Sequence, residues 1–181
     1  MKNLSRLLFI FMLTGMVFSG CKETKDLLDV TFQADYESDM DISVAPSTMK
    51  GGINGTFSSS TTIDPLTNEE FQKYAEKIKS VEILEVTGTI TSVNKNAVML
   101  DADLNITADA MPNAQWLFTN EPIEVGNVIS FTNENGQLDK LSAILNEKKA
   151  FTLTFSGQTD EDDVTYNISF YILAKVIANP L

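Results

Sequence analysis

The amino-acid sequence predicts a mainly β protein, an antiparallel β-sandwich (immunoglobulin-like or related) of about eight strands with two short helices. Many segments alternate apolar and polar residues at period two, which is the pattern of a strand with one buried face. Turn-forming residues separate these segments, and only two segments have helical spacing. Half-polar strands joined by short turns favour antiparallel sheets that stack through their apolar faces.

Alternation locates the first strands of the domain. Residues 28–36 alternate over their whole length, and shorter strands are expected at 42–44 and 53–57. The run from Ser58 to Thr62 is compatible with a strand or a loop. Gly51 and Gly52 predict a turn between these segments.

The clearest helix is expected over residues 66–79. Its apolar face is formed by residues at helical spacing, namely Phe71, Tyr74, Ala75 and Ile78. Thr67 is followed three residues later by Glu70, the spacing of a capping box at a helix N-terminus. The pattern predicts that Thr67 caps this helix.

Two long strands follow, and the turn at 94–96 predicts that they form a hairpin. In residues 81–93 the apolar phase shifts between Ile83 and Leu84, which indicates either a β-bulge or a strand that is buried on both faces. In residues 97–107 the side chains expected on one face are Val98, Leu100, Ala102, Leu104 and Ile106.

The second half of the domain repeats this mixture. Strands are expected at 115–119 and 126–132, a helix at 137–149, and a closing hairpin that turns at 157–163. From Val164 to Val176 one apolar phase holds throughout, which predicts a central strand.

The N-terminus has the three zones of an export signal. Lys2 and Arg6 precede an uncharged apolar stretch at 7–17, which is too short for a membrane-spanning helix. Phe18-Ser19-Gly20-Cys21 then places small residues before the single cysteine. This motif resembles the lipobox of bacterial lipoproteins, and the chain as a whole resembles small lipoproteins of Bacteroidota.

The resemblance implies how the chain is divided into segments and where the protein is located in the cell. It implies a signal peptide over 1–20, an acylated tether over 21–26 that begins with lipid-bearing Cys21, and a single domain over 27–181. It also implies an outer-membrane location, periplasmic or surface-exposed. Two or more acyl chains anchor a protein stably in a bilayer, and the bilayer is the first expected partner.

Charge and composition exclude several classes of function. All 25 acidic residues lie after residue 20, whereas Lys2 and Arg6 leave with the signal peptide, so 11 basic residues and a net charge of −14 remain. This balance argues against nucleic-acid binding, which depends on lysine and arginine. Since the chain contains no histidine, a Ser-His-Asp triad and histidine-ligated metals are excluded.

Three groups of residues are candidate sites. Asp101, Asp103 and Asn105 have the spacing that opens a calcium-binding EF-hand loop, but Ile106 and Pro112 stand where that loop requires Gly and Glu, and strand alternation explains the spacing better. Weak Ca²⁺ binding remains open at an acidic hairpin tip, formed by Asp160, Glu161, Asp162 and Asp163. A looser acidic group is formed by Asp35, Asp39 and Asp41.

Trp116, near Phe118 and Tyr36 in the expected fold, is either a core residue or part of a sugar-binding platform, and its apolar neighbours favour the core. No enzymatic activity and no cofactor are expected. The favoured hypothesis is a membrane-anchored, non-catalytic structural or protein-interaction module of the cell envelope. The alternative is a surface lipoprotein that binds a ligand or glycan, and a carboxylate-dependent hydrolase is the least favoured.

Overall fold

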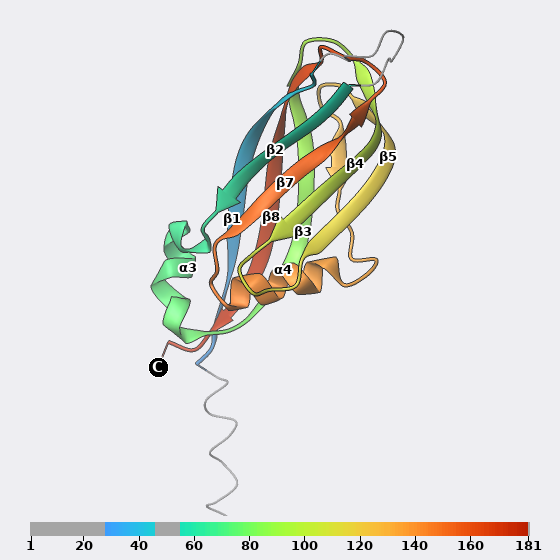
Figure 1. Ribbon diagram of the computed structural model, residues 1–181. Coiled ribbons are helices and arrows are strands. Elements are labelled where there is room, and N and C mark those ends of the chain that lie inside the picture. Colours follow the sequence, from blue (N-terminus) through green and yellow to red (C-terminus); the bar gives the residue numbers. More distant parts are fainter. Residues whose placement is uncertain (1–27, 46–54, 181) are drawn as a thin grey trace, which may run out of the picture.

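The computed structural model describes residues 28–45 and 55–180, and it consists of two four-stranded antiparallel sheets packed face to face (Figure 1). Sheet A has the spatial order β1 (Val30–Ser43), β8 (Thr165–Ala178), β3 (Ile78–Val93) and β6 (Val128–Ser130). Sheet B has the order β2 (Gly55–Ile63), β7 (Phe151–Thr159), β4 (Ala97–Thr107) and β5 (Ala114–Ile123). The predicted fold class is confirmed.

Several predictions lie outside the described residues. These are the signal peptide over 1–20, Cys21, the tether over 21–26, and the turn at Gly51 and Gly52.

The strand order is that of a jelly roll, the form of β-sandwich that the sequence did not distinguish from an immunoglobulin-like one. Among the described strands, only β4 and β5 are both consecutive and paired. All other connections pass from one sheet to the other. The predicted hairpins of β3 with β4 and of β7 with β8 are therefore wrong, because a turn signal reverses the chain without specifying the sheet it returns to.

Strand β8 is central, as its long regular alternation predicts. It pairs with β1 on one side and with β3 on the other. Its inward side chains are all buried, namely Tyr166, Ile168, Phe170, Ile172, Ala174, Val176 and Ala178. The strands predicted at 28–36 and 42–44 are parts of a single strand, because β1 is continuous from Val30 to Ser43.

Bulges set which side chains face inward. The bulge predicted in β3 is confirmed by a register shift between Ile83 and Glu85, which leaves Leu84 exposed. The register also shifts between Met99 and Asp101 of β4. The expectation that Val98 and Leu100 share a face with Ala102, Leu104 and Ile106 is therefore wrong. Met99 is buried, whereas Val98 and Leu100 are only half-buried.

The first helix is shorter than predicted. A 3-10 turn (Pro65–Thr67) precedes α3 (Glu69–Tyr74), a second 3-10 turn follows, and Ile78 already begins β3. Asn68, not Thr67, caps α3, because its side-chain oxygen accepts from Phe71 N at 3.0 Å. The Thr67 hydroxyl donates instead to the backbone oxygen of Asp64 at 2.7 Å.

The second helix, α4 (Gln137–Asn146), ends before Lys148 and Lys149. Its apolar stripe is confirmed, since Leu141, Ile144 and Leu145 are fully buried. Both helices lie at the end of the sandwich where the described chain begins and ends (Figure 1), and Val30 pairs with Ala178 there. No helix in the described ranges is long and apolar enough to cross a bilayer.

Candidate cleft between the β5 and β6 edges

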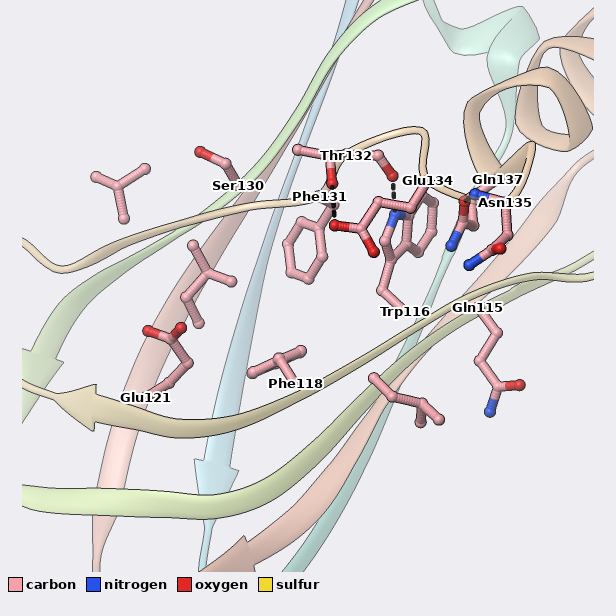
Figure 2. Close-up of a pocket in the computed structure, with 13 residues that line it drawn as sticks. Gln115, Trp116, Phe118, Glu121, Ser130, Phe131, Thr132, Glu134, Asn135 and Gln137 are labelled. Atoms are coloured by element: carbon pink, nitrogen blue, oxygen red, sulfur yellow. Dashed lines mark hydrogen bonds between the residues drawn. The ribbon is translucent and has the colours of Figure 1, made fainter.

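A cleft of about 450 Å³ opens between β5 and β6, the edge strands of the two sheets. Its volume falls within the range of roughly 300–1,000 Å³ that is usual for binding pockets. Side chains of β5, of β6 and of the segment leading to α4 line it (Figure 2). Its aromatic lining residues are Trp116, Phe118 and Phe131, and its acidic ones are Glu121 and Glu134.

Trp116 belongs to the core, which is the alternative that its apolar neighbours in the sequence favour. Its side chain is 7% exposed and packs edge-on against Phe131. Its indole Nε1 donates to the backbone oxygen of Thr132 at 2.7 Å (Figure 2). Tyr36 packs against Phe71 instead, so these rings do not form one platform.

The two carboxylates of the cleft lie in different parts of it (Figure 2). Glu134 lies near Trp116 and accepts a hydrogen bond from the Thr132 hydroxyl at 3.3 Å. Glu121 lies toward the other end, beyond Phe118 and Phe131. Glycosidases need two carboxyl groups that face each other across the scissile bond, whereas Figure 2 shows Glu121 and Glu134 toward different ends of the cleft.

Exposed apolar side chains gather around this cleft. Leu117, the outward residue between Trp116 and Phe118, is 75% exposed, and Val128 on β6 is 53% exposed. Both line the cleft, and Val125 in the β5–β6 connection is also exposed. Only five large hydrophobic side chains of the described residues are exposed, and three of them lie on β5, on β6 or in the connection between these strands.

The acidic segment predicted as a hairpin tip connects β7 of sheet B to β8 of sheet A, and contacts within the protein organise it. The Asp160 carboxylate accepts from Val98 N at 2.7 Å, and Glu161 forms an ion pair with Lys95 at 3.3 Å. Asn94 donates to the backbone oxygen of Asp163. Among the described residues, no group of three or more acidic side chains is arranged to hold a metal ion.

The two other acidic groups lie on outer sheet faces. Asp103 accepts from Gln115 Nε2 at 2.7 Å across β4 and β5, as the alternation explanation expects. Asp35, Asp39 and Asp41 are exposed on β1, and Asn167 donates to Asp41 at 3.0 Å.

On the outer face of sheet A, burial raises the pKa of Tyr171, and nearby carboxylates add to the effect. These carboxylates are Asp35, Glu85 and Glu37, in decreasing order of contribution. This face carries these carboxylates on β1 and β3 beside Tyr171 of β8, together with Lys175, which forms an ion pair with Glu82 at 3.2 Å.

Comparison with known proteins gives no family. No family model and no curated protein matches the chain. The solved structures that match the chain include viral ones. The decameric BFDV capsid protein matches with a TM-score of 0.42 at 9% identity, over 82% of this chain and 99% of that one.

Turnip yellow mosaic virus matches with a TM-score of 0.38 at 9% identity, over 84% of this chain and 95% of that one. Desmodium yellow mottle tymovirus matches with a TM-score of 0.37 at 8% identity, over 84% of each chain. Likeness at this level carries no functional conclusion.

The sequence predicts neither Leu117 nor the two glutamates as parts of a site. One signal is present, because Trp116-Leu117-Phe118 is a run of three large apolar residues within a strand. Since successive side chains of a strand point to opposite faces, at least one residue of such a run faces solvent. Nothing local indicates that Glu121 and Glu134, which lie on different segments, line the same cleft.

Proposed function

We propose that this protein is a membrane-anchored, non-catalytic lipoprotein that binds a partner protein of the cell envelope. The observation that carries the proposal is the cleft between β5 and β6, with exposed Leu117 and Val128 beside it. Exposed apolar residues gathered beside a polar-rimmed cleft are typical of protein-binding surfaces.

The anchoring part rests on the N-terminal sequence. Val30 begins β1 nine residues after Cys21. A chain of nine residues spans at most about 30 Å, so lipid on Cys21 holds the helical end of the sandwich close to the bilayer. The side of the sandwich, with the cleft, then remains accessible to a neighbouring protein.

Trp116 favours a protein partner over a glycan. A sugar platform requires an exposed aromatic face, but the Trp116 side chain is 7% exposed and its N–H is already bonded to Thr132. Leu117, the most exposed large hydrophobic residue described, offers apolar contact but no hydrogen bond to sugar hydroxyls.

Site-specific crosslinking in intact cells tests the binding surface. A photo-crosslinking residue at position 117 should capture one reproducible envelope protein. The same residue at Ser58, exposed on the outer face of sheet B, should not. Failure to capture a protein from position 117, or equal capture from both positions, would contradict the proposal.

Metabolic labelling tests the anchor. A radiolabelled fatty acid should be incorporated into the wild-type chain and not into Cys21→Ala. The variant should also leave the membrane fraction. Equal labelling of both chains would show that Cys21 is not the acylated residue.

A further inference from the structure

We infer that the partner inserts an extended, positively charged segment, which pairs as an added strand with the free edge of β6. This inference rests on the proposed function and specifies how the cleft is occupied. It follows from the backbone groups of β6, from the alternation of side chains along the cleft, and from the charge of its lining.

The backbone of β6 offers unpaired hydrogen-bonding groups. Phe131 N donates to Val86 O at 3.0 Å, and Ile90 N donates to Asn127 O at 3.0 Å. Because alternate residues of an antiparallel strand bond to the same neighbour, Val128 and Ser130 direct their N–H and C=O groups away from β3. Among the described strands, β3 alone pairs with β6, so this edge is available for strand addition.

The other edge of the cleft is less suited to backbone pairing. Asn120 of β5 has a left-handed φ of 59°, and Pro122 lacks an N–H group. Both interrupt the regular series of donors that an added strand requires. Strand β5 instead supplies side chains, because Trp116 and Phe118 line the cleft opposite β6.

The shape of the cleft fits alternating side chains. Its length follows β5 from Gln115 to Glu121, a distance of about 20 Å at the usual rise per strand residue. An extended segment of about six residues covers this length. Alternate residues of that segment would face the aromatic lining, and the remaining ones would point outward.

The charge of the cleft selects a cationic segment. Glu121 and Glu134 line it toward different ends, and no lysine or arginine is among its described lining residues. A second copy of this acidic chain would repel these carboxylates, whereas lysine or arginine side chains near the ends of an added strand would pair with them.

Binding of synthetic hexapeptides to the purified mature protein tests the inference. An alternating Val-Lys peptide should bind, measured by fluorescence anisotropy, and should protect the amides of Val128 and Ser130 from hydrogen exchange. A Val-Glu peptide should not bind. A Val-Lys peptide that is N-methylated at every residue should also fail, since it cannot donate along that edge.

Two protein variants with matched charge changes locate the site. Glu121→Lys/Glu134→Lys should weaken binding of the Val-Lys peptide about tenfold. Glu37→Lys/Asp39→Lys on the exposed face of β1 should leave it unchanged. Equal binding of the N-methylated peptide, or equal weakening by both variants, would overturn the inference.

The outcome can be separated from that of the proposed function. Capture of a partner from position 117 with no peptide binding would retain a protein-binding cleft and reject strand addition. Self-association of the protein through β6 would also reject the cationic partner. No capture from position 117 would remove the proposed function itself.

Discussion

At the residue scale, Trp116 has a structural role, because its side chain packs in the core and donates a hydrogen bond to the backbone. Its ring belongs to the core and also lines the cleft, and its N–H donates to the backbone oxygen of Thr132 on the opposite wall. The hydrogen bond joins β5 of one sheet to the segment that follows β6 of the other. Trp116 thus links the two edges that form the cleft.

Trp116→Phe tests this role. The variant keeps an aromatic ring but leaves the Thr132 carbonyl without its donor, so the free energy of unfolding should fall by about 1–3 kcal/mol. Urea unfolding followed by far-UV circular dichroism measures it, because Trp116 is the single tryptophan. Exposed Leu117→Ala should change stability by no more than about 0.5 kcal/mol, and equal losses would contradict the assignment.

Two buried tyrosines make stability depend on alkaline pH. Burial raises the pKa of Tyr36 and Tyr166 above the ordinary value near 10. Asp35 and Asp64 raise that of Tyr36 further. The folded protein thus retains the neutral phenols while the unfolded chain ionises. This contribution to stability is complete below pH 10 and is lost as the pH rises above 10 toward the folded-state pKa.

Tyr36→Phe should therefore lose less stability than the wild type between pH 9.5 and about 11. The Tyr36 hydroxyl is buried with no hydrogen-bond partner among the described residues. At pH 7 the variant should for this reason be as stable as the wild type or slightly more stable. Urea titrations at several pH values measure both effects, and a parallel pH dependence of the two proteins would contradict the explanation.

At the element scale, the start of α3 shows how a local motif can be displaced by its surroundings. The sequence predicts a capping box of Thr67 with Glu70. In the structure the helix begins at Glu69, so Asn68 is the N-cap residue. Asn68 also donates to the backbone oxygen of Asp35 at 3.3 Å. This contact with β1 links the helix start to sheet A, which no rule restricted to neighbouring residues anticipates.

Asn68→Ala should destabilise the protein by about 1 kcal/mol, because the N–H of Phe71 loses its acceptor. Thr67→Ala should cost less, since its exposed hydroxyl only donates to Asp64. Chemical denaturation of the two variants side by side gives the comparison. A larger loss for Thr67→Ala would restore Thr67 as the cap.

At the scale of the whole molecule, aromatic side chains hold the two sheets together. Phe155 of sheet B packs against Phe57 and Phe118 in its own sheet and against Phe170 of sheet A. Phe155 and Phe170 are fully buried. One side chain thus couples the stability of both sheets.

Phe155→Ala should reduce the free energy of unfolding by about 3–5 kcal/mol, the usual range for a fully buried phenylalanine. Hydrogen exchange should accelerate together in β4 and β8, since they lie in opposite sheets. Phe32→Ala, at a partly buried position beside Tyr74, should cost clearly less. Faster exchange confined to sheet B would contradict the coupling.

The sequence by itself determined the fold class, most strand positions, the β3 bulge, the central place of β8 and the apolar stripe of α4. All of these follow from periodicity within about fifteen residues. It also predicts the lipid anchor at Cys21, which stays a prediction. Only the tertiary structure decided which sheet each strand joins, and therefore that β5 and β6 face each other across a cleft. The physical reason is that strand partnership depends on contacts between distant residues, such as Val30 with Ala178, and no local pattern encodes these contacts.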